Sequence, residues 1–332
     1  MTAYPQAFPA TRLRRLRQAH WIRDLTAEHA LTPRDLVWSI VVHDGAEARI
    51  PVESMPGNDR LNVDEAAKAA ERARELGIPA IAIFPNINPN VKDEGGSEAL
   101  NPDGLVPSVI QAMKAAAPEV GIVCDVALDP FTSHGHDGVI DDDGYVLNDA
   151  TTELLVAQAI LQARAGADVV APSDMMDGRI GAIRAALEDE GFSNTLILSY
   201  AAKYASGFYG PYRDAIGSAT ALKGDKKTYQ QNPANTDESL REVAMDIEEG
   251  ADMVMVKPGL PYLDIVRRVS QEFAIPTLAF QVSGEYAQIM AAAERGWIDG
   301  DRVMMETLLS FKRAGASGII TYFADRAAEK LG

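Results

Sequence analysis

Eight short, β-rich apolar runs alternate along the chain with longer segments in which apolar residues recur every three or four positions. Such runs are typical of buried strands, and the longer segments are typical of amphipathic helices. The eight predicted strands are Val37–Val42, Ala80–Phe84, Gly121–Val126, Asp168–Ala171, Thr195–Ser199, Met253–Val256, Thr277–Phe280 and Ile319–Tyr322. Because strands that pair in parallel need a crossover between them, this alternation predicts a parallel sheet.

A glycine separates the end of several predicted helices from the next strand. The pattern occurs at Gly77, Gly166, Gly250 and Gly315, where glycine supplies the left-handed conformation of a helix C-cap. The predicted helices include Asp64–Leu76, Thr152–Ala165, Arg179–Glu190, Asp237–Glu249, Leu263–Phe273 and Arg302–Ala314. Eight βα units without a linker favour a closed (β/α)8 TIM barrel, an α/β fold, over an open doubly wound sheet. We therefore predict one catalytic domain over residues 35–332.

Residues 1–34 precede the first predicted strand and form no βα unit of their own. Trp21 and several leucines are irregularly spaced in this segment, which is typical of an extended N-terminal arm. An arm without a core tends to bury its apolar side chains on a neighbouring subunit, so it predicts a homo-oligomer. The alternative is a helix that covers the bottom of its own barrel.

Charge and composition exclude several classes of partner and site. The formal net charge of −17 disfavours nucleic acid and anionic membranes, and the basic residues within 12–17 are interpreted as solvated or interface charge. A single cysteine, Cys124, excludes a disulfide framework and a multi-thiolate zinc site within the chain. No apolar run approaches the roughly 20 residues of a membrane span, and no signal-peptide pattern is found, so a cytoplasmic location is expected.

Two lysines follow predicted strands at the end of the barrel where active sites of this fold lie. Lys257 comes directly after Met253–Val256, and Lys203 follows the run that ends at Ser199. Burial lowers the pKa of a lysine, and two ammonium groups in one mouth would each lower the pKa of the other. Because Schiff-base formation needs a neutral amine, we predict that both lysines capture ketones. A structural ion pair is the alternative for either lysine.

Two long loops are predicted to act as lids, near residues 127–145 and 204–229. The second loop carries Arg213, Lys223, Lys226 and Lys227. Arg213 and Lys226 are candidates for binding a substrate carboxylate, the first by paired hydrogen bonds and the second as a point charge. A solvated charged loop is the alternative.

The motifs around these lysines carry a resemblance to a known family. The segments SYAAKYAS (199–206), FYGPYRD (208–214) and MVKPGLPYLD (255–264) closely resemble the porphobilinogen synthase family, also called 5-aminolevulinate dehydratase. The resemblance extends through TRLRR (11–15), DVALDPFTSHG (125–135), APSDMMDGR (171–179), QVSGEY (281–286) and ITY (320–322). These motifs are highly specific and span essentially the whole chain.

The resemblance implies that two molecules of 5-aminolevulinate condense to porphobilinogen with loss of water, in the biosynthesis of haem and other tetrapyrroles. It implies that each lysine holds one substrate ketone as an imine. Lys257 would carry the propionate-side substrate, whose carboxylate would meet Ser283 and Tyr322.

Lys203 would carry the acetate-side substrate, whose carboxylate would meet Arg213 and Lys226. Asp125 would lie near the two lysines and would move protons or orient the ammonium groups. An imine makes the adjacent carbon acidic, and tethering brings both substrates to a high effective molarity. Catalysis then needs few groups besides these residues, and no organic cofactor is expected.

Metal binding is the point at which this sequence departs from the family pattern. Zinc-using members carry three cysteines where this chain has Ala127, Asp129 and Asp137, so no catalytic zinc is expected. His134 and His136 in the same loop are too close in sequence to imply one tetrahedral zinc site. The two aspartates leave magnesium or potassium open as an ion that the sequence does not require.

Glu238 matches a glutamate that binds an allosteric magnesium ion outside the active site in some relatives. The alternative is an exposed glutamate in the first turn of a helix, where the helix dipole favours it. The resemblance also implies octamers assembled by arm exchange, or smaller assemblies such as hexamers, and the predicted arm agrees with both.

The alternatives to a porphobilinogen synthase are another Schiff-base enzyme and a barrel without catalytic activity. A class I Schiff-base aldolase would also use a barrel lysine, but sugar phosphates need glycine-rich turns or a helix N-terminus after strands seven and eight. Glu285 and Asp325 follow those strands here, and acidic residues would repel phosphate. The other rival is a non-catalytic barrel scaffold, which would have lost one of the two lysines that this chain keeps.

Overall fold

The computed structural model describes residues 7–217, 222 and 224–332 of the chain. Contacts within the chain divide it into two compact units, residues 1–30 and 31–332. The described part of the first unit contains a 3-10 turn, η1 (Leu13–Arg17), and a short helix, α1 (His20–Leu25), neither of which buries a side chain. Its exposed large apolar side chains are Phe8, Leu13, Leu16, Trp21 and Leu25. The described part of this unit therefore has no hydrophobic core of its own.

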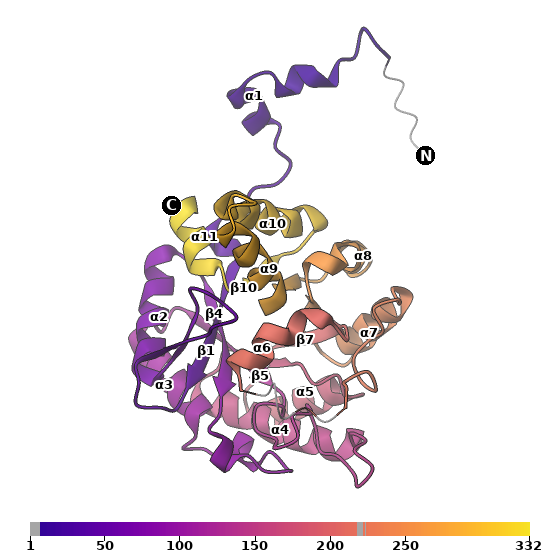
Figure 1. Cartoon of the computed structure of the whole chain (residues 1–332). Coiled ribbons are helices and arrows are strands. Elements are labelled where there is room, and N and C mark those ends of the chain that lie inside the picture. Colours follow the sequence, from indigo (N-terminus) through magenta and orange to yellow (C-terminus); the bar gives the residue numbers. More distant parts are fainter. Residues whose placement is uncertain (1–6, 218–221, 223) are drawn as a thin grey trace. The chain divides into compact units, whose positions relative to one another are not determined.

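Parallel strands close into a barrel in the second unit, as predicted (Figure 1). Neighbouring strands follow one another in chain order, and pairing of the last strand with the first closes the ring. The barrel strands are β1 (Leu36–His43), β4 (Ala80–Asn86), β5 (Gly121–Val126), β6 (Val169–Pro172), β7 (Leu196–Lys203), β8 (Met253–Lys257), β9 (Thr277–Gln281) and β10 (Gly318–Thr321). A short antiparallel hairpin, β2 (Arg49–Pro51) and β3 (Asp59–Leu61), pairs with the end of β1. The predicted (β/α)8 TIM barrel is confirmed.

Helices connect the barrel strands. They are α2 (Val63–Leu76), α3 (Leu105–Ala116), α4 (Asn148–Ala165), α5 (Arg179–Asp189), α6 (Gly210–Ala215), α7 (Asp237–Glu248), α8 (Leu263–Phe273), α9 (Ser283–Glu294), α10 (Gly300–Ala314) and α11 (Ala324–Leu331). Shorter 3-10 turns are η2 (Pro33–Asp35), η3 (Pro89–Val91), η4 (Ser97–Leu100), η5 (Gly207–Tyr209) and η6 (Leu260–Tyr262). Gly77, Gly166 and Gly315 adopt the predicted left-handed conformation at the C-caps of α2, α4 and α10.

One strand is longer than predicted, and the difference bears on the site. The sequence predicts a strand that ends at Ser199, whereas β7 continues through an irregularity in its pairing between Ser199 and Ala202 and ends at Lys203. Lys203 is therefore the last residue of β7, and its register partner on β8 is Lys257. An irregularity of this kind adds residues to one strand without ending its pairing, which apolar periodicity does not reveal.

The barrel interior is formed by apolar and aromatic side chains, among them Phe84, Tyr200 and Phe280, each of which is almost fully buried. Burying an aromatic or aliphatic side chain of this size contributes about 1.5–3 kcal/mol to stability. Cys124 on β5 is also buried within this core. None of the described helices combines the length and the apolar character that a membrane crossing requires.

The two predicted lid segments differ in structure. Residues 127–145 contain turns and an isolated bridge between Ile140 and Val146, but no helix. The segment 204–229 contains η5 and the short helix α6. Lys223, which belongs to this second predicted lid, lies outside the described residues.

Candidate active site

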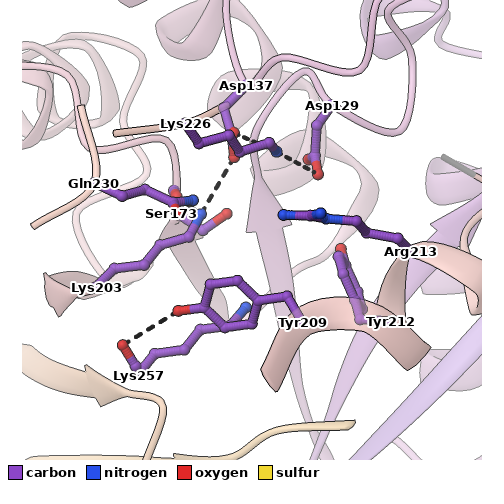
Figure 2. Close-up of a pocket in the computed structure, with 10 residues that line it drawn as sticks. All are labelled: Asp129, Asp137, Ser173, Lys203, Tyr209, Tyr212, Arg213, Lys226, Gln230 and Lys257. Atoms are coloured by element: carbon purple, nitrogen blue, oxygen red, sulfur yellow. Dashed lines mark hydrogen bonds and ion pairs between the residues drawn. The ribbon is translucent and has the colours of Figure 1, made fainter. Parts of the chain in front are cut away.

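The ends of β7 and β8 bring the two predicted lysines into one cavity at the mouth of the barrel (Figure 2). Lys203 and Lys257 are register partners on neighbouring strands. The backbones of two neighbouring strands lie about 4.8 Å apart. Only 5% of Lys203 and 6% of Lys257 is exposed. The cavity is lined by Asp129, Asp137, Ser173, Lys203, Tyr209, Tyr212, Arg213, Lys226, Gln230 and Lys257.

Lys257 lies among aromatic rings and forms no ion pair with a described residue. Its Nζ is 4.6 Å from the ring centre of Phe280, 4.9 Å from that of Tyr200 and 5.3 Å from that of Tyr212. Burial, followed by the nearby charge of Lys203, lowers the pKa of Lys257 to about 7. A substantial fraction of this amine is therefore neutral near neutral pH, which is the form that attacks a ketone.

Lys203 has a different environment from its partner, because it is held by oxygen atoms. Its Nζ lies 3.2 Å from Oδ1 of Asp137 and also donates a hydrogen bond to the carbonyl oxygen of Ser173. Oδ2 of Asp137 lies 2.6 Å from Nζ of Lys226, which is also 3.2 Å from Oδ2 of Asp129. Lys203, Asp137, Lys226 and Asp129 thus form a row of alternating charges along one side of the cavity (Figure 2).

Asp137 is the centre of this row. Burial by itself would raise the pKa of Asp137, but the ammonium groups of Lys203 and Lys226 outweigh it and hold this pKa well below its usual range. The hydroxyl of Tyr229 also donates a hydrogen bond of 2.9 Å to Oδ2 of Asp137. Asp137 therefore stays ionised and forms ion pairs with both Lys203 and Lys226 when the cavity holds no substrate.

Asp125 lies close enough to both lysines to interact with their charges. It occupies β5, and its Oδ1 is enclosed without a hydrogen-bond partner among the described residues. Burial raises the pKa of Asp125 to about 6, although the charge of Lys257 opposes this rise. A carboxyl group whose pKa is near neutral can both accept and return a proton, as general acid–base catalysis requires.

The two predicted carboxylate-binding cations differ in availability. Arg213 on α6 points into the cavity and forms no ion pair or side-chain hydrogen bond with a described residue (Figure 2). Lys226 is already paired with Asp129 and Asp137, which outweigh burial and raise its pKa. An incoming carboxylate would meet the free guanidinium of Arg213 first and would compete with the two aspartates for Lys226.

Ser283 and Tyr322 lie next to the cavity and not among its lining residues. The hydroxyl of Ser283 accepts a hydrogen bond of 2.8 Å from the backbone N–H of Tyr212 and donates one of 3.4 Å to the carbonyl of Phe208. Tyr322 is 3% exposed, and its hydroxyl makes no hydrogen bond of regular geometry with a described residue. Ser283 therefore contacts the lid in this conformation, and the hydroxyl of Tyr322 lies near that of Ser39.

The positions that correspond to the zinc cysteines of some relatives carry an alanine and two paired aspartates in this chain. Asp129 and Asp137 already share the ammonium group of Lys226, which occupies the position between them. Ala127, at the third position, has no ligand atom and is buried. Among the described residues, no three or more histidine, cysteine, aspartate or glutamate side chains are grouped so that they could hold a metal ion.

Glu238 lies away from the catalytic cavity, in the first turn of α7. Its carboxylate accepts a hydrogen bond from the side-chain amide of Asn235. With Asp177 and Glu242 it lines a separate depression on the outer side of the second lid. The structure therefore groups the other candidate residues at the barrel mouth and leaves Glu238 outside that group.

Several residues around the cavity were not predicted from the sequence. Tyr209, Tyr212 and Gln230 line the cavity, but they lie in or directly after the second predicted lid, whose sequence has no apolar periodicity that could indicate which side chains point inward. Glu285 was interpreted only as a residue that would repel phosphate, whereas it is buried and accepts backbone hydrogen bonds. A glutamate near the start of a helix, directly after a strand, is a capping signal that could have indicated this role.

A closed parallel barrel with two buried lysines at the carboxyl ends of neighbouring strands defines the class of (β/α)8 enzymes with amine groups in the active site. Residues 10–330 match the family described as delta-aminolevulinic acid dehydratase. The chain belongs to this family.

Individual relatives support this assignment. The delta-aminolevulinic acid dehydratase of Bradyrhizobium diazoefficiens is 60% identical over 329 residues, which cover 99% of this chain and 93% of the relative. That of Rhodobacter capsulatus is 55% identical over the full length of both chains. A crystal structure of delta-aminolevulinic acid dehydratase (porphobilinogen synthase) from Toxoplasma gondii, in complex with the reaction product porphobilinogen, is 47% identical, with a TM-score of 0.95 over 98% of this chain and 92% of that one.

Proposed function

We propose that this protein is a porphobilinogen synthase, a hydro-lyase that condenses two molecules of 5-aminolevulinate to porphobilinogen with loss of water in tetrapyrrole biosynthesis. The observation that carries this proposal is the pairing of Lys203 with Lys257 across β7 and β8, inside a single buried cavity. Two amines that come from paired residues of neighbouring strands suit a reaction in which two ketones must be held side by side. The family and the product-bound relative support the same substrate and product.

The two lysines begin the reaction in different states, which suits an asymmetric condensation. Lys257, with its lowered pKa, attacks a ketone as a neutral amine, and the resulting imine makes the adjacent carbon acidic. Lys203 is paired with Asp137, so its Nζ has to leave this ion pair before it reacts. Asp125 lies near both lysines and suits proton exchange with the carbon and nitrogen atoms of the two substrates. Tethering both substrates then replaces a collision in solution by a reaction inside one cavity.

The substrate carboxylates are assigned to two sides of the cavity. On the acetate side, Arg213 and Lys226 neutralise the carboxylate of the substrate on Lys203, and Arg213 is the cation with no ion pair among the described residues. On the propionate side, Ser283 and Tyr322 donate hydrogen bonds to the carboxylate of the substrate on Lys257. The hydroxyl of Tyr322 is buried with only the hydroxyl of Ser39 near it, so it can turn to a substrate carboxylate, which supports this assignment.

Turnover of 5-aminolevulinate to a pyrrole, detected as the coloured adduct of the pyrrole with an aromatic aldehyde, tests the proposal. A class I aldolase would instead cleave or form a carbon–carbon bond in a phosphorylated sugar and would give no pyrrole. A non-catalytic barrel scaffold would give no product from either substrate. Absence of the pyrrole with folded protein at saturating 5-aminolevulinate would reject the proposal.

Catalysis is proposed to need neither zinc nor an organic cofactor, and neither magnesium nor potassium is required in the cavity. Exhaustive chelation is expected to leave a basal turnover that needs no metal ion in the cavity, because the ammonium group of Lys226 already neutralises Asp129 and Asp137. Zinc, magnesium and potassium are then returned one at a time while the initial rate is measured. Loss of turnover on chelation that only zinc restores would contradict this account.

An allosteric magnesium site at Glu238 is a separate proposal, supported by the acidic side chains of Asp177 and Glu242 that line the same depression. The depression contains oxygen ligands of the kind that a hydrated magnesium ion prefers. Stimulation of the chelated enzyme by magnesium, and its loss in Glu238→Ala, tests this role separately from the basal activity.

Residues 1–34 are proposed to form an arm that assembles the protein into a homo-oligomer, as an octamer or a hexamer, in the cytoplasm. The support is the exposure of Phe8, Trp21 and Leu25 in a unit whose described part has no core. Light scattering with and without residues 1–30 tests the arm, since its removal is expected to reduce the mass of the assembly.

A further inference from the structure

The turn that follows Lys257 is fixed by a single buried carboxylate. Glu285, in the first turn of α9, is 1% exposed. The backbone N–H of Leu260 donates to its Oε1 at 2.7 Å, and the N–H of Gly259 donates to its Oε2 at 3.2 Å. The N–H of Val282 also donates to Oε2, at 2.7 Å. One side chain therefore ties the segment directly after Lys257 to the junction between β9 and α9.

These bonds go beyond an ordinary helix cap, which would satisfy donors of its own helix only. Two of the three donors of Glu285 belong to the turn after β8, which is remote in sequence. No cation forms an ion pair with Glu285 among the described residues, so backbone N–H groups compensate its charge. Burial raises the pKa of Glu285 to about 7, although these N–H donors oppose the rise.

The same turn of α9 is where the second lid docks. Ser283 accepts the hydrogen bond of Tyr212, the residue that precedes Arg213 on α6. Gly284 packs directly against the backbone of Phe208, where a Cβ atom would approach the carbonyl oxygen more closely than Cβ atoms do in proteins. The lid therefore contacts the side-chain hydroxyl of Ser283 and the backbone of Gly284, next to the residue whose carboxylate fixes the turn after Lys257.

We infer that Glu285 is a positioning residue that couples docking of the lid, through Ser283 and Gly284, to the placement of the Lys257 amine in the cavity. The inference deepens the proposed function and rests on it. A lid closed by the binding of a substrate carboxylate to Arg213 presses on the first turn of α9. Through its hydrogen bonds to the N–H groups of residues 259 and 260, Glu285 shifts this turn together with α9. The position of the turn then sets the direction in which the side chain of Lys257 points at the end of β8. Among the described residues, Lys203 on β7 forms no hydrogen bond with Glu285, with residues 259 and 260 or with the first turn of α9.

The substitution Glu285→Gln tests this coupling, because the amide keeps one acceptor oxygen and turns an N–H group toward a backbone N–H. Glu294→Gln, an exposed position on the same helix, is the matched control. Each protein is treated with 5-aminolevulinate and borohydride, and the reduced adducts at the two lysines are measured by peptide mass. Glu285→Gln is expected to lower the rate of trapping at Lys257 about tenfold or more, as expected for the loss of a hydrogen bond to a charged group, and to leave the rate at Lys203 nearly unchanged.

A second variant, Gly284→Ala, moves the lid without touching Glu285. The coupling predicts slower trapping at Lys257 in this variant too, together with a raised KM. Equal loss at both lysines in Glu285→Gln would reduce Glu285 to a structural role, and unchanged trapping at Lys257 in either variant would overturn the coupling. Failure of the proposed function would be recognised separately, because the unaltered protein would then give neither an adduct nor a pyrrole.

Discussion

Replacement of Lys257 by methionine is expected to lower kcat/KM for 5-aminolevulinate by a factor of about 10⁴ or more. The substitution removes the amine that captures one ketone, and with it the covalent tether that brings the second substrate to a high effective molarity. Methionine fills nearly the same volume among Phe280, Tyr200 and Tyr212, so the cavity should keep its shape. Steady-state pyrrole formation measures the loss.

Lys227→Met is the control for Lys257→Met, because Lys227 lies in the same lid as Arg213 but its side chain is 75% exposed, and Asp225 is its ion-pair partner among the described residues. Its activity is expected to stay within about twofold, as usual for an exposed ion pair. The stability of Lys257→Met should be equal to or greater than that of the unaltered protein, because the variant no longer buries an amine. Retention of more than about one per cent of the activity would contradict a covalent role for Lys257.

Replacement of Arg179 by methionine is expected to lower the free energy of unfolding by about 3–5 kcal/mol. Arg179 is 1% exposed, and its guanidinium lies 2.9 Å from Asp246 and 3.7 Å from Asp174. It also donates a hydrogen bond of 3.3 Å to Ser199 on β7. Removal of the cation leaves two buried carboxylates without compensation, which is more costly than loss of the ion pair itself.

Arg164→Met is the matched control for this substitution, since Arg164 pairs with Glu190 at the surface, where both side chains are about half exposed. Its effect on stability is expected to be about 0–1 kcal/mol, as for most exposed ion pairs. Denaturant midpoints of the two variants give the comparison. Equal midpoints would mean that Arg179 is not the centre of a stabilising network.

Much of the fold could be predicted from the sequence, because buried parallel strands and glycine C-caps are local signals. The predicted strand Gly121–Val126 and helix Leu263–Phe273 agree with the structure at both ends. Lys257 could be predicted as a rim residue, because it directly follows an uninterrupted apolar run. Lys203 was placed beyond its strand, since the irregular pairing of β7 depends on the neighbouring strand and not on periodicity.

The parts of the site that could not be predicted depend on contacts between distant segments. Nothing local distinguishes Arg179 from Arg302, which also begins a predicted helix, and the burial of Arg179 depends on its contacts with Asp174 and Asp246. The pairing of Lys226 with Asp129 and Asp137 similarly needs two lids to meet. Sequence patterns identify which residues bear reactive groups, whereas tertiary packing decides which of those groups are neutral, charged or already paired.

Lys257 is expected to offer a neutral amine to a ketone near neutral pH. The most direct measurement is the rate of borohydride trapping of 5-aminolevulinate on the peptide that contains Lys257, as a function of pH. Because the neutral fraction of an amine rises as pH passes through its pKa, the rate should rise between about pH 6 and pH 8, with a midpoint near 7. An unmodified peptide from folded protein, or a rate that continues to rise toward the ordinary lysine pKa of 10.5, would contradict the account.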